Sequence, residues 1–128
     1  MGKGIDHICV VADDPDKSVD FYTRVLGFEF VMSETLADQG IEISRVRYRG
    51  DVVEFVKHLD PDARPGRGDG AIELIGIAVS DVRAEAKRLR ELGVECLMDE
   101  PVMRPGGGFF FFRGPSGEKL ELVQTDEG

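Results

Sequence analysis

The sequence contains few cysteines, an excess of acidic over basic residues and no long apolar run. A membrane-spanning helix needs about 20 consecutive apolar residues, and none occurs in the 128 residues. Residues 1–7 form no signal-peptide apolar segment, so we expect a cytoplasmic protein. The net charge of −9 repels phosphate backbones. We therefore expect neither nucleic acid nor a membrane as a partner.

The two cysteines, Cys9 and Cys96, lie far apart in apolar, strand-like segments and form no CxxC motif. This pattern favours reduced core cysteines in a reducing compartment over a disulfide framework. Apolar residues make up 41% of the chain and charged residues 32%, the balance of a soluble globular protein. A chain of this length is typical of one ordinary domain.

One sequence pattern occurs twice in the chain. Residues 5–11 align with residues 72–78 at an offset of 67, and residues 50–56 align with residues 117–123 at the same offset. An acidic residue, an amphipathic stretch and a glycine follow both residues 5–11 and residues 72–78; the glycine is Gly27 in the first copy and Gly93 in the second. A single repeat of this length predicts two equivalent modules that share one core. We place module 1 at residues 1–59, a linker at 60–71 and module 2 at 72–128.

Each module is predicted to contain a strand, a helix and three more strands. In the first, Asp14 and Pro15 are typical of a helix start, and Gly27 of its end. The helical apolar stripe is assigned to Val19, Tyr22, Val25 and Leu26. The predicted strands are residues 5–11, 28–35, 41–49 and 52–57.

In the second module, Ser80 or Asp81 is expected to cap the helix, which ends at Gly93. Its apolar stripe is assigned to Val82, Ala86, Leu89 and Leu92. The predicted strands are residues 72–79, 94–98, 108–113 and 119–124. The fold class expected from this order is α+β.

Three polar residues, His7, Glu54 and Glu121, interrupt apolar strands at repeat-related places. A single histidine or glutamate in a strand more often has a structural role. The repeat strengthens a functional interpretation, because Glu54 and Glu121 occupy the same place in the two modules. A buried carboxylate is costly unless it is paired or coordinated, and two carboxylates with an imidazole suit a divalent cation.

The run HICVVADDPDKSVDFYTRVLGF at residues 7–28 and the run PSGEKLEL at residues 115–122 carry a family resemblance. They resemble the first module and the closing strand of the vicinal oxygen chelate superfamily, which includes glyoxalases, bleomycin-resistance proteins and extradiol dioxygenases. The resemblance implies two βαβββ modules that form a cup-shaped mixed sheet with the helices outside. It also implies a metal site on the first and last strand of each module. Carried over by position, those residues are His7, Glu54, Leu74 and Glu121.

The glyoxalase I branch, with a His, Glu, His, Glu set, is the most similar. Leu74 cannot coordinate a metal, so either His7, Glu54 and Glu121 hold a divalent ion with added water, or no metal is bound. The ion would be Ni, Zn, Mn, Fe or Co. It would act as a Lewis acid while Glu121 or Glu54 moves a proton, in lyase, isomerase or epimerase chemistry. A dioxygenase is less favoured, because its iron site usually requires two histidines.

The alternative is a metal-free, ligand-sequestering protein of the bleomycin-resistance type. Leu74 and the net negative charge favour it, and a pairing of the glutamates with arginines would favour it further. Residues 109–112 are four phenylalanines, of which alternation places two on the inside of the predicted cup and two on the outer layer. Core packing is the simpler role for them, and stacking on a flat ligand is the more specific one. Open sheet edges also predict a homodimer.

Overall fold

The computed structural model describes residues 2–64 and 68–125. Residues 65–67 of the predicted linker and 126–128 of the predicted second module lie outside the described residues. The chain divides into two compact units, which we call the first half (residues 7–73) and the second half (residues 1–6 and 74–128). Each half is described by itself below.

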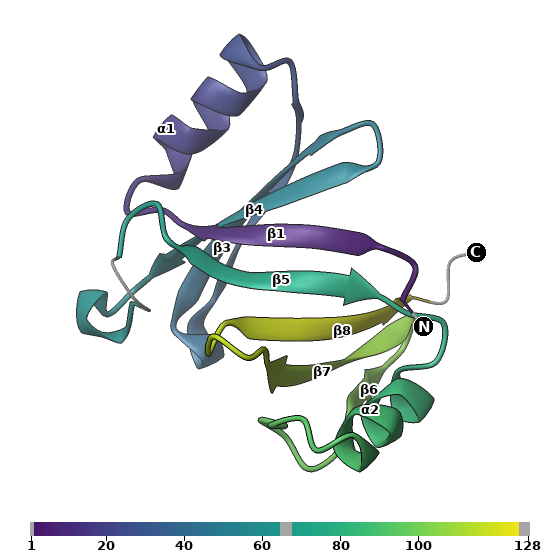
Figure 1. Cartoon of the computed structure of the whole chain (residues 1–128). Coiled ribbons are helices and arrows are strands. Elements are labelled where there is room, and N and C mark those ends of the chain that lie inside the picture. Colours follow the sequence, from purple (N-terminus) through teal and green to yellow (C-terminus); the bar gives the residue numbers. More distant parts are fainter. Residues whose placement is uncertain (1, 65–67, 126–128) are drawn as a thin grey trace. The chain divides into compact units, whose positions relative to one another are not determined.

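The first half is a four-stranded mixed sheet with one short helical segment (Figure 1). Strand β1 runs parallel to β4, whereas β2, β3 and β4 pair antiparallel, in the order β2-β3-β4-β1. The elements are β1 (Ile5–Val11), α1 (Pro15–Asp20), the π-helix η1 (Phe21–Val25), β2 (Glu29–Leu36), η2 (Ala37–Gln39), β3 (Ile41–Tyr48), β4 (Asp51–His58) and η3 (Pro61–Ala63).

The second half repeats this plan with the order β5-β8-β7-β6, and β5 is parallel to β8. Its elements are β5 (Ile72–Ala78), α2 (Val82–Glu91), β6 (Val102–Arg104), β7 (Gly107–Arg113) and β8 (Lys119–Thr125). Both halves therefore follow the order strand, helix, three strands, and the predicted α+β class is confirmed. No helix in the described part of the chain is long and apolar enough to span a membrane.

The helix starts follow the predicted capping chemistry. The Asp14 carboxylate accepts a hydrogen bond from the Lys17 amide at 3.3 Å, and Pro15 is the first helical residue. In the second half Asp81, rather than Ser80, is the cap and accepts from the Ala84 amide at 3.1 Å. These bonds satisfy amides that have no partner within the helix.

Part of the predicted apolar stripe of the first helix is wrong. Val19 and Tyr22 pack on the core, but Val25 and Leu26 are 51% and 48% exposed. The α-helix ends at Asp20 and continues as the π-helix η1, whose wider turn breaks the 3.6-residue spacing. Leu92, the last member predicted for the second stripe, is also exposed.

The strand predicted at residues 94–98 is wrong as well. Only Cys96 forms an isolated bridge there, to Phe112, and the strand that pairs with β7 is β6. The Glu95 carbonyl and the Leu97 amide bond to Arg113 and Phe111 of β7 on either side of this bridge. Directly after it, the Arg90 guanidinium donates to the carbonyls of Met98 and Asp99, at 3.0 and 2.7 Å. All other predicted strand ends agree with the structure to within one residue.

Each half has its own apolar core between the sheet and the helical segment. In the first half Phe55 packs against Tyr22, with ring centroids 4.9 Å apart, and Tyr22 packs against Phe28. In the second half Phe110 and Phe112 lie in a cluster with residues of α2. In each sheet, alternation places the remaining side chains on the face turned away from this core.

Candidate functional site

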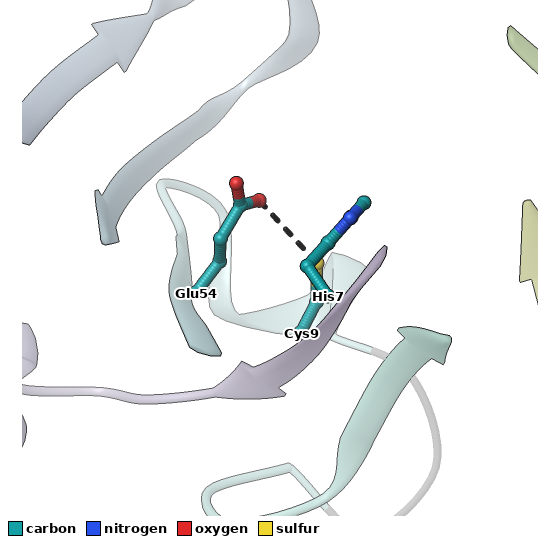
Figure 2. A group of neighbouring side chains, drawn as sticks. All are labelled: His7, Cys9 and Glu54. Atoms are coloured by element: carbon teal, nitrogen blue, oxygen red, sulfur yellow. Dashed lines mark hydrogen bonds between the residues drawn. The ribbon is translucent and has the colours of Figure 1, made fainter. Parts of the chain in front are cut away.

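A buried group of polar side chains lies on β1 and β4 of the first half. His7 and Cys9 are two residues apart on β1, so strand alternation places them on one face. Glu54 on β4 is the register partner of Cys9. Figure 2 shows the three side chains on the same side of the two strands. All three are buried, with 9%, 4% and 8% exposure for His7, Cys9 and Glu54, and their ligand atoms all lie within 4.8 Å of one another.

The two oxygens of the Glu54 carboxylate have different neighbours. Oε2 accepts a hydrogen bond from Arg45 Nε at 2.7 Å and lies 2.6 Å from Arg45 Nη2. Oε1 faces the Cys9 thiol, which donates to it across 3.5 Å. Arg45 reaches Glu54 because β3 and β4 place the two residues opposite each other. This guanidinium compensates the charge that the buried carboxylate would otherwise carry alone.

The Cys9 thiol is protonated in this environment. Burial raises the pKa of Cys9 from 9.0 to about 11, because a thiolate would be poorly solvated there. A hydrogen bond with His7 lowers the pKa, and the negative charge of Glu54 raises it. Cys9 is therefore a neutral donor toward Glu54 at neutral pH.

In the second half, Glu121 matches Glu54, but its neighbours on the adjacent strands differ from those of Glu54. Glu121 pairs in register with Gly76 on β5 and with Phe111 on β7. The aromatic rings of Phe109 and Phe111 lie 5.2 Å apart, and Lys119 Nζ lies 4.3 Å from the centre of the Phe111 ring. The alternation predicted for residues 109–112 is confirmed, since Phe110 packs in the α2 core instead.

His7 and Glu54 lie together, as their predicted roles require, and the structure adds Cys9 and Arg45 to them. Glu121 belongs to the second half, and its membership of the metal set stays a prediction. The sequence contained a signal for Cys9, because it shares a strand face with His7. It contained no comparable signal for Arg45, whose role depends on the β3–β4 register.

The donors of the first half fit a divalent metal ion. An imidazole, a thiolate and a carboxylate are typical zinc-type ligands, and two ligands about 2.0–2.3 Å from a tetrahedral ion lie about 3.3–3.8 Å apart. The 3.5 Å separation of Cys9 Sγ and Glu54 Oε1 falls in this interval. Arg45 Nε and Nη2 both contact Oε2, the other oxygen of this carboxylate. His7, Cys9 and Glu54 would thus hold such an ion.

Known proteins similar to this chain include enzymes. A probable lactoylglutathione lyase of Synechocystis sp. is 26% identical, over 93% of this chain and 93% of its own length. The methylmalonyl-CoA epimerase of Mycobacterium tuberculosis superposes with a TM-score of 0.82 and 27% identity, over 97% of this chain and 89% of its own. A variant of the Streptomyces coelicolor methylmalonyl-CoA epimerase in complex with 2-nitronate-propionyl-CoA gives a TM-score of 0.82 at 27% identity, over 99% and 97%.

The sequence model of one family also matches, and it covers residues 4–122. This span includes every element of both halves except the end of β8. It also includes the candidate-site residues of the first half, His7, Cys9, Arg45 and Glu54, and Glu121 of the second half. The chain belongs to the Glyoxalase/Bleomycin resistance protein/Dioxygenase superfamily.

Proposed function

We propose that the protein is a divalent-metal-dependent lyase or isomerase that moves a proton at a carbon next to a carbonyl group. The observation that carries this proposal is the buried group of His7, Cys9 and Glu54, with Oε1 of Glu54 turned toward Cys9. When bound, a divalent cation supplies a Lewis acid for a substrate oxygen. Ni, Zn, Mn, Fe and Co are the candidate ions.

The two glutamates are assigned different tasks. Arg45 holds Oε2 of Glu54 in a charge-assisted pair, which fixes that carboxylate as a binding group. In the second half, Phe111 occupies the place that corresponds to Arg45. Glu121 occupies in β8 the place that Glu54 occupies in β4, and we assign it the transfer of the substrate proton.

The names of the similar proteins support a substrate class. Lactoylglutathione and methylmalonyl-CoA are both thioesters with a hydrogen on the carbon next to the thioester carbonyl. That hydrogen is the one a glutamate base would remove and return. We propose that a small thioester, or a carbonyl compound that yields one, is the ligand of this chain.

Hydrogen exchange tests the proposal. The protein, loaded in turn with each candidate ion, is incubated in D₂O with methylmalonyl-CoA or with lactoylglutathione, and proton NMR follows the hydrogen next to the thioester carbonyl. We expect exchange that requires the metal and is lost in Glu121→Gln, with Glu118→Gln as the control. Exchange no faster than in buffer, with every ion and both thioesters, would reject the assignment.

A second candidate function is metal-free ligand binding. Two observations favour it: Arg45 already neutralises Glu54, and Leu74 occupies the place of a family ligand. In this case Phe109 and Phe111 would stack on a flat ligand. Protein purified without chelator would then contain no metal by elemental analysis, and bleomycin would raise its thermal midpoint. Bound metal together with no effect of bleomycin would exclude this candidate.

We further propose that the protein acts as a homodimer in the cytoplasm. Large apolar side chains at the end of η1, directly after it and at the start of β2 are about half exposed, among them Val25, Leu26 and Phe30. Association of two chains would remove this surface from water. Sedimentation at micromolar concentration should give twice the mass of 14.1 kDa. A single species of monomer mass would contradict the proposal.

A further inference from the structure

We propose that Cys9 is a metal ligand, which supplies through its sulfur the protein donor that Leu74 does not provide. The ion would then be held within the first half by His7, by Cys9 Sγ and by Glu54 Oε1. This inference rests on the proposed function, because it concerns the same ion. It goes beyond the resemblance, which places ligands at His7, Glu54, Leu74 and Glu121 and none at Cys9.

The backbone places Cys9 in the position that such a role requires. It stands two residues from His7 on one strand face and directly opposite Glu54 on the neighbouring strand. Its sulfur is 3.5 Å from Oε1, and the ligand atoms of all three residues lie within 4.8 Å of one another. Small changes of side-chain torsion would therefore bring three donors to one ion without a shift of the sheet.

Arg45 is compatible with this arrangement as a positioning residue. Its Nε and Nη2 both contact Oε2, so the carboxylate is turned with Oε1 toward Cys9. Ligating carboxylates are commonly hydrogen-bonded by such an outer partner, which fixes their orientation. The ion pair that favours metal-free binding can thus also hold Glu54 in place for a metal.

The charge and proton balance of the step is simple. The ion forms a bond to Cys9 Sγ, the S–H bond breaks, and the proton passes to the buffer, as for other coordinated thiols. The site then carries the thiolate and the Glu54 carboxylate against the divalent ion and Arg45. No oxidant or reductant takes part.

The second half and the other cysteine provide the contrast for a test. Gly76 occupies in β5 the place that Cys9 occupies in β1, so that half offers no sulfur at the matching position. Cys96 lies in the second half, where its thiol contacts the Val94 carbonyl at 3.4 Å. A signal from a metal-bound thiolate can therefore be assigned by comparing variants of the two cysteines.

The experiment is a titration of chelator-stripped protein with Co²⁺, read by the near-ultraviolet absorption of a cobalt–thiolate bond and by proton release in weak buffer. We expect this absorption to saturate at one Co²⁺ per chain in the parent protein and in Cys96→Ser. It should disappear in Cys9→Ser and Cys9→Ala, with at least about tenfold weaker binding and less proton release. Far-ultraviolet circular dichroism checks that each variant is folded.

The possible failures are distinct. Tight cobalt binding without the thiolate absorption would overturn the role of Cys9 and leave the metal-dependent function standing. Persistence of the absorption in both Cys9 variants would also overturn it. No cobalt binding by the parent protein would reject both the ligand assignment and the metal-dependent function.

Discussion

The two halves of the chain share a backbone plan but differ in the chemistry of the sheet face turned away from the helix. In the first half, Glu54 lies between Cys9 and Arg45. In the second half, Glu121 lies between Gly76 and Phe111. The position of His7 is taken by Leu74 in the repeat alignment. Packing constrains the side chains that lie under the helix. The side chains of the opposite face differ between the halves, and the metal-type donors His7, Cys9 and Glu54 all lie in the first half.

The largest effect that we expect is a difference in unfolding free energy between substitutions on the two faces of β7. Phe110→Ala should lower the free energy of unfolding by about 3–5 kcal/mol, because it leaves a cavity in the α2 core. Phe110 is fully buried in that core. Phe109→Ala, on the other face, should cost about 1 kcal/mol or less. Urea unfolding measures both, and equal costs would show that the faces are not divided as described.

A second prediction concerns the Arg45–Glu54 pair of the first half. Arg45→Met should lower the free energy of unfolding by about 2–3 kcal/mol, because Glu54 is left buried without its partner. The value is below that of a fully buried pair, since the Arg45 side chain is 38% exposed. The control is Arg47→Met, which removes an exposed pair with Glu29 at 3.7 Å and should cost under about 0.5 kcal/mol.

The same pair gives a double-variant check. Adding Glu54→Gln to Arg45→Met removes the unpaired charge and should restore about half of the lost free energy. The loss of unfolding free energy caused by Glu54→Gln is measured in the parent protein and in Arg45→Met. If the two losses are equal, the two side chains do not interact and the Arg45–Glu54 pair is absent.

A third prediction concerns the pH dependence of the metal-free protein. The pKa of Cys9 is raised in the folded state, from 9.0 to about 11, so its contribution to stability is complete below pH 9 and is lost as the pH rises toward 11. We expect the free energy of unfolding to fall by on the order of 2 kcal/mol more in the parent protein than in Cys9→Ser across this interval.

The measurement is urea unfolding in chelator and reductant at a series of pH values. Cys96→Ser should follow the parent protein, since it keeps the Cys9 thiol. A Cys9→Ser curve parallel to that of the parent would show that the thiol is not shielded from solvent in the folded state.

The smallest effect that we expect is on metal affinity, in a variant whose second half resembles the first. Leu74→His restores the histidine of the four-residue set that the resemblance implies, so it should tighten binding of Ni²⁺, Zn²⁺ and Mn²⁺ by about tenfold, or ~1.4 kcal/mol. Calorimetric titration of parent and variant measures the difference. Equal affinity in both proteins would count against a role for the Leu74 position and for Glu121 in the metal set.

The sequence sufficed to predict the α+β class, the Asp14 cap and all strands but one, and it narrowed the second cap to Ser80 or Asp81. These features depend on local patterns, namely alternation, helix caps and the repeat. The π-helix η1 was missed because it arises from a local departure, a widened helical turn. The strand β6 was missed because its three residues are too few to show an alternation pattern.

The candidate site was predictable in part. His7 and Glu54 were identified because polar residues in apolar strands require partners. Cys9 was assigned to the core, since a buried cysteine usually behaves as a small apolar residue. Arg45 could not be found, because its contact with Glu54 depends on the exact register of two antiparallel strands and on which carboxylate oxygen it holds.

The central claim is that the first half holds a divalent cation. Its most direct test is calorimetric titration of chelator-stripped parent protein and of Glu54→Gln with Zn²⁺. Glutamine retains an oxygen for Arg45 but removes the charge, so the fold should be kept. We predict one ion bound per parent chain and at least about tenfold weaker binding in Glu54→Gln. Negligible binding by the parent, or equal affinity in the two proteins, would contradict the claim.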